Sequence, residues 1–78
     1  MPTIFEIFVF KIIIQTMDHN PPHVHCKSPD GEVLIEIKNQ NVLRNHGLHT
    51  SDIKLLKKFI SDHKDVPINE WRHFHGEE

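Results

Sequence analysis

The sequence is poor in the residues that cross-link small proteins or mark them as strongly charged. Its 78 residues include one cysteine, one tryptophan, three glycines and no tyrosine. Because Cys26 is the only cysteine, the chain excludes an internal disulfide framework and an all-cysteine zinc site. Positive charge is not in excess either, since nine Lys and Arg stand against eleven Asp and Glu, a net charge of -2. That balance excludes a histone-like nucleic-acid binder and still allows a local basic patch.

A long hydrophobic run is also missing. The apolar stretch at residues 4–14 is shorter than the roughly 20 residues that span a bilayer. Glu6 and Lys11 interrupt the stretch, no basic residue precedes it, and no small-residue cleavage site follows it, so it does not match a signal peptide. We therefore expect a cytoplasmic protein with a reduced Cys26 and no association with membranes.

The beginning of the chain predicts β-structure. Ile, Phe and Val dominate residues 3–15, and β-branched and aromatic residues favour a strand. Both faces of this segment are largely apolar, which fits either one long central strand or two strands that turn near Val9. No Asn-Gly or Asp-Gly pair marks a turn there, so the sequence leaves the choice open.

A β-hairpin is predicted over residues 23–38. Two segments that alternate with period two flank the Ser-Pro-Asp-Gly sequence at residues 28–31, which is a strong turn signal. With these four residues as the loop, Lys27 pairs with Glu32, and His25 pairs with Leu34. This register places an apolar set on one face: Val24, Cys26, Val33 and Ile35. It places a polar set on the other face: His23, His25, Lys27, Glu32 and Glu36.

The second half of the chain predicts helices. A short strand fits the apolar pair Val42 and Leu43. Helical spacing then predicts a helix with Thr50 or Ser51 as its N-cap, which ends near His63 or Lys64, before Pro67. A second short helix follows, capped by Asp65. The predicted fold class is therefore α+β: a small antiparallel sheet of three to five strands, with one or two C-terminal helices packed on one face, in a single domain over residues 1–78.

Three segments carry a resemblance to a known family. They are the opening Met-Pro-Thr-Ile-Phe, the His-Asn-Pro-Pro-His-Val-His block at residues 19–25, and Asp-Gly-Glu at residues 30–32. In these segments the chain resembles the bacterial family called domain of unknown function 4160. Val9 departs from the glycine that is usual in the family, and residues 45–49 add histidines. The family has no settled activity, but its members are often encoded beside another small protein, as toxin–antitoxin pairs are. The resemblance thus implies a protein partner from a neighbouring gene and supplies no catalytic residue.

Histidine is abundant, with eight residues in the chain, and four interpretations of its main cluster stay open. The first is a site for a divalent metal such as zinc, with His19, His23, His25 and Glu36 as ligands. His23 and His25 lie two residues apart on a strand, so their rings project from one face and can share an ion. The stiff Pro-Pro connector would hold His19 nearby, and Glu36 lies across the hairpin as a ligand or as a support for one.

The second interpretation is metal-independent chemistry on RNA. Here His23 and His25 act as base and acid, and Lys27 stabilises the charge that develops on the phosphate. The third interpretation is purely structural, with the two histidines forming a rigid corner against the prolines and bonding to backbone carbonyls.

The fourth interpretation is an interaction surface for a partner or for nucleic acid. Helical geometry groups Lys54, Lys57 and Lys58 on one side of the first helix, although a solvated helix face is the commoner meaning of such a pattern. Apolar strands in so small a domain also favour a homo-oligomer formed through an exposed edge. The leading expectation is one component of a toxin–antitoxin-like pair that acts through protein association and carries a histidine cluster for a divalent metal. The alternatives are a ribonuclease-type toxin and an interaction module with a structural histidine corner.

Overall fold

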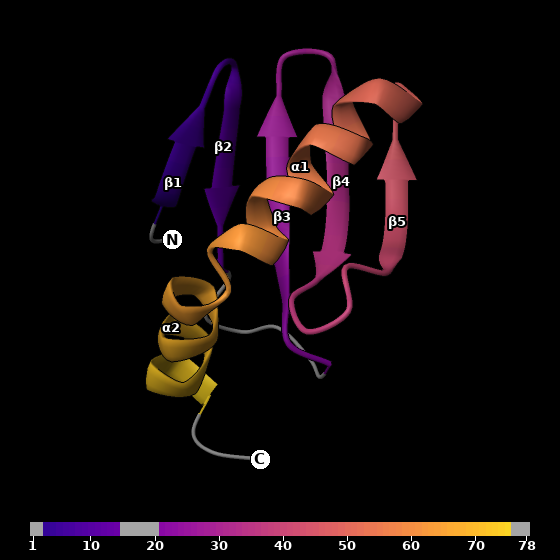
Figure 1. The fold of residues 1–78 in the computed structure, drawn as a ribbon. Coiled ribbons are helices and arrows are strands. Elements are labelled where there is room, and N and C mark those ends of the chain that lie inside the picture. The colour runs from indigo at the N-terminus through magenta and orange to yellow at the C-terminus, as the bar shows by residue number, and fades with distance from the viewer. Residues whose placement is uncertain (1–2, 15–20, 76–78) are drawn as a thin grey trace.

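The protein is an antiparallel sheet followed by two helices, as Figure 1 shows. The computed structural model describes residues 3–14 and 21–75. Its five strands pair in sequence order, β1-β2-β3-β4-β5, which confirms the predicted α+β class and the upper end of the predicted strand number. The elements are β1 (Thr3–Ile7), β2 (Phe10–Ile13), β3 (His23–Ser28), β4 (Gly31–Glu36), β5 (Val42–His46), α1 (Thr50–Asp62) and α2 (Asp65–His75).

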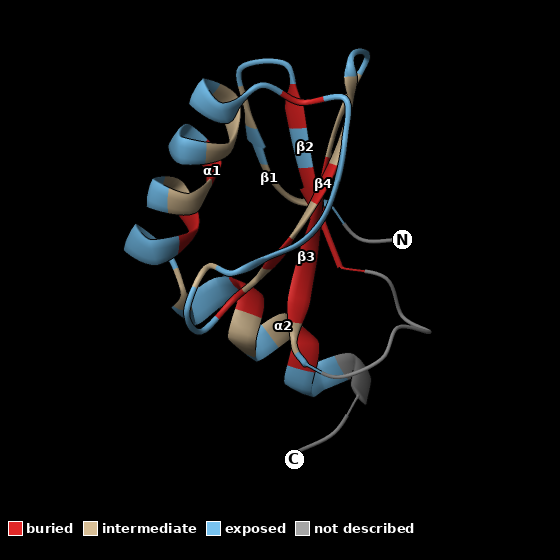
Figure 2. Cartoon of the chain, turned by 90° about the vertical axis from the view of Figure 1, so that its right-hand side faces the viewer, coloured by how far each residue is buried: buried red, intermediate tan, exposed pale blue. Residues whose placement is uncertain are grey.

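One face of the sheet is covered by α1, which crosses it diagonally in Figure 1 and stands to one side of it in Figure 2. Leu56 and Ile60 of α1 are buried there. Helix α2 lies at one end of the sheet, below β3 in Figure 2, and contributes Trp71, which is 2% exposed. The side chains of the core cluster are Phe10, Ile12, Ile14, Val24, Cys26, Val33, Ile35, Ile37, Leu48, Leu56, Ile60 and Trp71.

The ends of α1 differ in how well the sequence predicts them. The predicted N-cap is wrong, because Thr50 is already helical and the N-cap is His49, whose side chain forms no capping hydrogen bond. The C-terminus is as predicted, with His63 as the C-cap and its N–H donating to the Ile60 carbonyl. Neither α1 nor α2 is long and apolar enough to cross a membrane.

The first apolar segment forms two strands, which answers the question that the sequence left open. β1 and β2 pair antiparallel, with Ile7 opposite Phe10. The turn forms without glycine because Phe8 takes a left-handed backbone conformation, with φ of 55°, which is uncommon for a bulky residue. Phe8 and Val9 at this turn are 82% and 61% exposed. An aromatic ring is therefore held in solvent on a strained turn.

The β3–β4 hairpin confirms the predicted register. Lys27 pairs with Glu32, His25 with Leu34, and the pairing extends to Ser28 and Gly31 at the turn. Ser28 Oγ donates a hydrogen bond of 3.3 Å to the Gly31 carbonyl, which helps to close the four-residue loop. Since alternate residues of a strand face opposite sides, this register sends the predicted apolar set toward α1.

Two glycines allow β5 to lie close to the β3–β4 turn. A Cβ on Gly31 would collide with the backbone carbonyl of His46. Gly47 has φ of 88°, and a Cβ there would lie 2.7 Å from the Asp30 carbonyl oxygen. Glycine is the residue that accepts both the close approach and the positive φ. These contacts fix the end of β5, and with it His46, beside the turn.

The buried thiol of Cys26 gives a test of this packing. Burial, helped by the negative charge of Glu32, raises the pKa of Cys26 to about 12. The thiolate is the reactive form, so we expect iodoacetamide to modify native Cys26 at least about 100-fold more slowly than the same residue in unfolded chain. Mass spectrometry of samples with and without urea measures this ratio.

The same shift predicts how stability depends on pH. A pKa that is raised in the folded state means that the unfolded chain loses the proton first, so the free energy of unfolding falls as pH rises above about 8.5 to 9. In Cys26→Ala the free energy of unfolding is lower at neutral pH because of the cavity, and this alkaline decline is shallower. Equal native and denatured alkylation rates, or identical alkaline slopes in both proteins, would contradict a buried thiol.

Candidate functional site

The sheet face opposite α1 carries a row of charged side chains. Neighbouring strands align one residue each in the order Glu6, Lys11, Lys27, Glu32 and His46. The next row contains Thr3, Ile13, His25, Leu34 and Arg44. Because directly opposed side chains have Cβ atoms about 4.5–5.5 Å apart, the two rows bring charged groups from all five strands onto one face.

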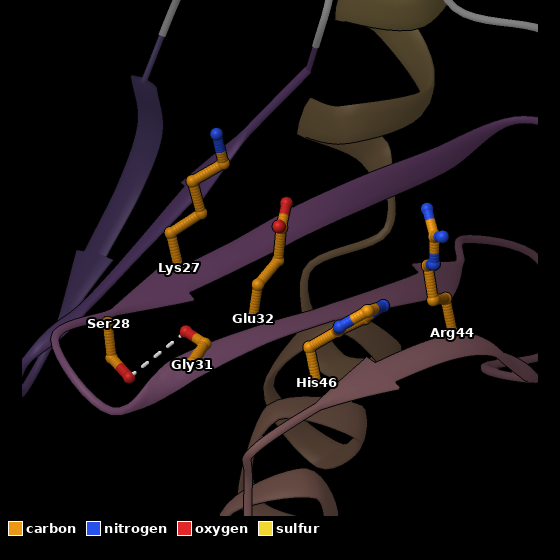
Figure 3. Close-up of a pocket in the computed structure, with 6 residues that line it drawn as sticks. All are labelled: Lys27, Ser28, Gly31, Glu32, Arg44 and His46. Carbon is orange, nitrogen blue, oxygen red and sulfur yellow. Dashed lines mark hydrogen bonds between the residues drawn. The ribbon is translucent and has the colours of Figure 1, made fainter.

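Part of this face is a pocket of about 440 Å³. Figure 3 shows Lys27, Glu32 and Arg44 rising from the same side of the sheet, from β3, β4 and β5, with His46 beside them. We call this the sheet-face pocket, and its lining residues are Lys27, Ser28, Gly31, Glu32, Arg44 and His46. Three basic side chains and one carboxylate therefore meet in one solvent-accessible hollow.

Glu32 is held in place by a buried histidine. His25 Nδ1 lies 3.0 Å from Glu32 Oε2, and the His25 residue as a whole is 7% exposed. The side chain of Glu32 is 35% exposed, so its carboxylate bridges the buried ring and the pocket. This contact orients the carboxylate of Glu32 toward the buried ring.

His23 lies deeper, at the end of the sheet where α2 packs. It is 5% exposed, and its Nδ1 donates a hydrogen bond of 2.8 Å to the Pro21 carbonyl. Its ring centroid is 5.3 Å from that of His25 and 5.4 Å from that of Trp71. These contacts fit the structural interpretation, in which the histidines form a corner at the start of β3.

The remaining predicted metal ligands are not all placed. His19 lies outside the described residues, and Glu36 pairs with His23 across the hairpin. Among the side chains that the structure describes, in residues 3–14 and 21–73, no group of three or more His, Cys, Asp or Glu residues is arranged to hold a metal ion. The metal site of His19, His23, His25 and Glu36 stays a prediction.

The predicted ribonuclease residues are His23, His25 and Lys27, and their catalytic role stays a prediction. The rings of His23 and His25 are neighbours, with centroids 5.3 Å apart. Lys27 lines the sheet-face pocket, His25 contacts that pocket through Glu32, and His23 packs against Trp71. The lysine group on α1 lies on the other side of the sheet, where Lys54 and Lys58 are exposed and Lys58 forms an ion pair of 3.4 Å with Asp62. It shares no surface with the pocket.

Sequence reasoning missed Arg44 and His46 as pocket residues. Their strand was predicted only around Val42 and Leu43, so they had no assigned face. Once β5 extends through His46, its pairing with β4 places His46 opposite Glu32 and Arg44 opposite Leu34. The signal that could have found them is the spacing of two basic residues two positions apart, which is the period of a strand.

Comparison with known proteins gives one match. The model of the family described as Domain of unknown function (DUF4160) matches residues 8–72. No significant match to the chain is found among curated proteins or solved structures.

The structural role of His23 is testable by truncation. His23→Ala removes a buried ring that contacts Trp71, so the free energy of unfolding falls by about 2–4 kcal/mol, as for other buried large-to-small changes. The near-ultraviolet circular dichroism of Trp71 changes in the native state as well. The matched control is His49→Ala, which truncates an exposed histidine without a capping bond. It changes the free energy of unfolding by less than about 0.5 kcal/mol and leaves the near-ultraviolet circular dichroism unchanged. Equal stabilities of the two variants would contradict the buried corner.

Proposed function

The chain belongs to the DUF4160 family, and we propose that it is one component of a toxin–antitoxin-like pair that acts by binding a second small protein. The feature that supports this proposal is the exposed turn between β1 and β2. Phe8 and Val9 there are 82% and 61% exposed, although aromatic and branched side chains gain free energy by leaving water. Phe8 also occupies a strained backbone conformation. Apolar groups presented in this way are typical of binding surfaces.

A second pocket lies beside this turn. It measures about 310 Å³, and we call it the turn pocket; its lining residues are Val9, Lys11, Lys27, Ser28 and Pro29. It forms between the β1–β2 and β3–β4 turns, so an inserted side chain would contact both hairpins. Val9, which follows the exposed Phe8 in the turn, lines this pocket, and hot-spot residues of protein interfaces typically fill pockets of this kind.

The charges around the turn pocket indicate what kind of segment fits. Lys11 and Lys27 pair directly across β2 and β3, and like charges in that position repel each other. Among the residues that the structure describes, no carboxylate lines the pocket. A partner segment with an apolar side chain flanked by carboxylates would fill the pocket and remove the repulsion, which favours an acidic protein over a basic one.

Divalent-metal binding is not needed for this proposal. The Nδ1 atoms of His23 and His25 already contact Pro21 and Glu32, so both rings have partners within the protein. Association through the turn pocket uses neither ring.

The proposal is tested by co-expressing the chain with the product of the adjacent gene and measuring complex formation by size exclusion and calorimetry. We expect a stable complex that Phe8→Asn weakens at least about tenfold, because the aromatic anchor is lost. Asn accepts a left-handed backbone more readily than Phe, so the melting temperature of Phe8→Asn stays equal or rises. Weaker binding therefore cannot come from unfolding.

The matched control is Leu43→Asn, which changes a 43% exposed apolar residue on the opposite edge strand, β5. Its affinity for the partner stays at the wild-type value. Elution of the wild-type chain alone, or as a homo-oligomer in the presence of the partner, would contradict the proposal. So would equal effects of Phe8→Asn and Leu43→Asn.

A further inference from the structure

We infer that the sheet-face pocket binds a phosphate group of RNA and that the protein cleaves the RNA strand at that phosphate without a metal ion. This activity goes beyond the proposed association. The two pockets share Lys27 and Ser28, and the acid–base residues of the proposed reaction, Glu32 and His46, line the sheet-face pocket alone. The pocket volume of about 440 Å³ falls in the range of sites for small ligand groups. The substrate class follows from the charges and the acid–base groups that line it.

The positive charges point to a phosphate. Lys27 comes from β3 and Arg44 from β5, so they flank the pocket from two sides (Figure 3). Neither forms an ion pair with a carboxylate of the described residues, where the ion pairs are His25–Glu32 and Lys58–Asp62. A guanidinium group and an ammonium group that face one hollow can hold the two non-bridging oxygens of a phosphodiester.

The acid–base pair lies between these charges. Glu32 and His46 are directly opposite on β4 and β5, and the carboxylate of Glu32 is oriented by His25 at 3.0 Å. The close approach of Gly31 to the His46 backbone holds the main chain of His46 beside the pocket. Directly paired residues on neighbouring strands have Cβ atoms about 4.5–5.5 Å apart, so a base and an acid lie within reach of one phosphate bound in the pocket, as proton transfer to and from its two ester oxygens requires.

The reaction balances with the RNA as its own nucleophile. Glu32 takes the proton of the ribose 2′-hydroxyl, whose oxygen forms a bond to phosphorus. The bond from phosphorus to the 5′-oxygen breaks, and His46, entering as imidazolium, donates a proton to that oxygen. Lys27 and Arg44 stabilise the negative charge that builds on the phosphate. The products are a 2′,3′-cyclic phosphate and a free 5′-hydroxyl.

The test uses a fluorescein-labelled oligoribonucleotide of mixed sequence and the same sequence with every 2′-hydroxyl methylated, both in EDTA. We expect the wild-type chain to bind both and to cleave only the unmodified one. Mass spectrometry identifies fragments that end in 2′,3′-cyclic phosphate. No cleavage of the unmodified RNA, or equal cleavage of the methylated RNA, would overturn the inference.

Variants assign the activity to the pocket. Glu32→Gln and His46→Gln each lower the cleavage rate at least about 100-fold, the usual loss when a general acid or base is removed, while both oligonucleotides stay bound. Arg44→Ala weakens binding of both. His49→Gln, a change at an exposed histidine outside the pocket, keeps the wild-type rate. His46 lies on an exposed strand, so His46→Gln remains folded even if Glu32→Gln does not. Unchanged cleavage by His46→Gln would overturn the inference, because the activity would then come from a contaminating nuclease.

RNA cleavage and partner binding can be tested separately, because different variants abolish them. Phe8→Asn keeps the RNA-cleaving activity and loses the partner, whereas His46→Gln keeps the partner and loses the activity. Failure of the RNA-cleavage proposal can therefore be distinguished from failure of the partner-binding proposal.

Discussion

The pairing of β3 with β4 is the constraint on which the rest of the structure depends. Ser28 to Gly31 form the loop, and Lys27 is thereby set opposite Glu32 and His25 opposite Leu34. A shift by one residue would exchange the faces of every side chain on one strand. Val24 and Cys26 would then leave the core beneath α1, and the charged row of the opposite face would be lost. The core beneath α1 and the Lys27–Glu32 pair of the opposite face thus follow from one register.

This register could be predicted because its information is local. The turn residues and the two alternating segments lie within sixteen residues of one another, and only one alignment puts apolar residues together. The α+β class and the end of α1, with His63 as its C-cap, were predictable for similar reasons. The turn at Phe8 was not, because it uses a strained non-glycine residue where sequence rules expect glycine or asparagine.

The site was harder to predict than the fold because it depends on distant parts of the chain. The alternation placed His23 and His25 on a polar face, but Trp71, almost fifty residues later, packs against His23 and turns it into part of a buried corner. His46 becomes a neighbour of Glu32 through the pairing of β5 with β4, which required the full length of β5. Contacts of this kind arise from tertiary packing, which residue patterns do not encode directly.

The two proposed surfaces share Lys27 and Ser28. An acidic partner in the turn pocket would place its carboxylates next to the lysine that we assign to the RNA phosphate, so the two ligands would compete for one charge. A protein that binds at the turn would in this way also restrain chemistry on the sheet face. This geometry links association and activity through a single side chain and needs no conformational change.

The β3–β4 register is tested most directly by measuring cross-strand nuclear Overhauser effects in an isotope-labelled sample. The β3–β4 pairing predicts main-chain contacts between His25 and Leu34 and between Lys27 and Glu32, together with side-chain contacts from Cys26 to Leu56 or Ile60 of α1. Contacts that pair His25 with Val33 or Ile35 instead would contradict it, since the histidines would then share the face that the core occupies.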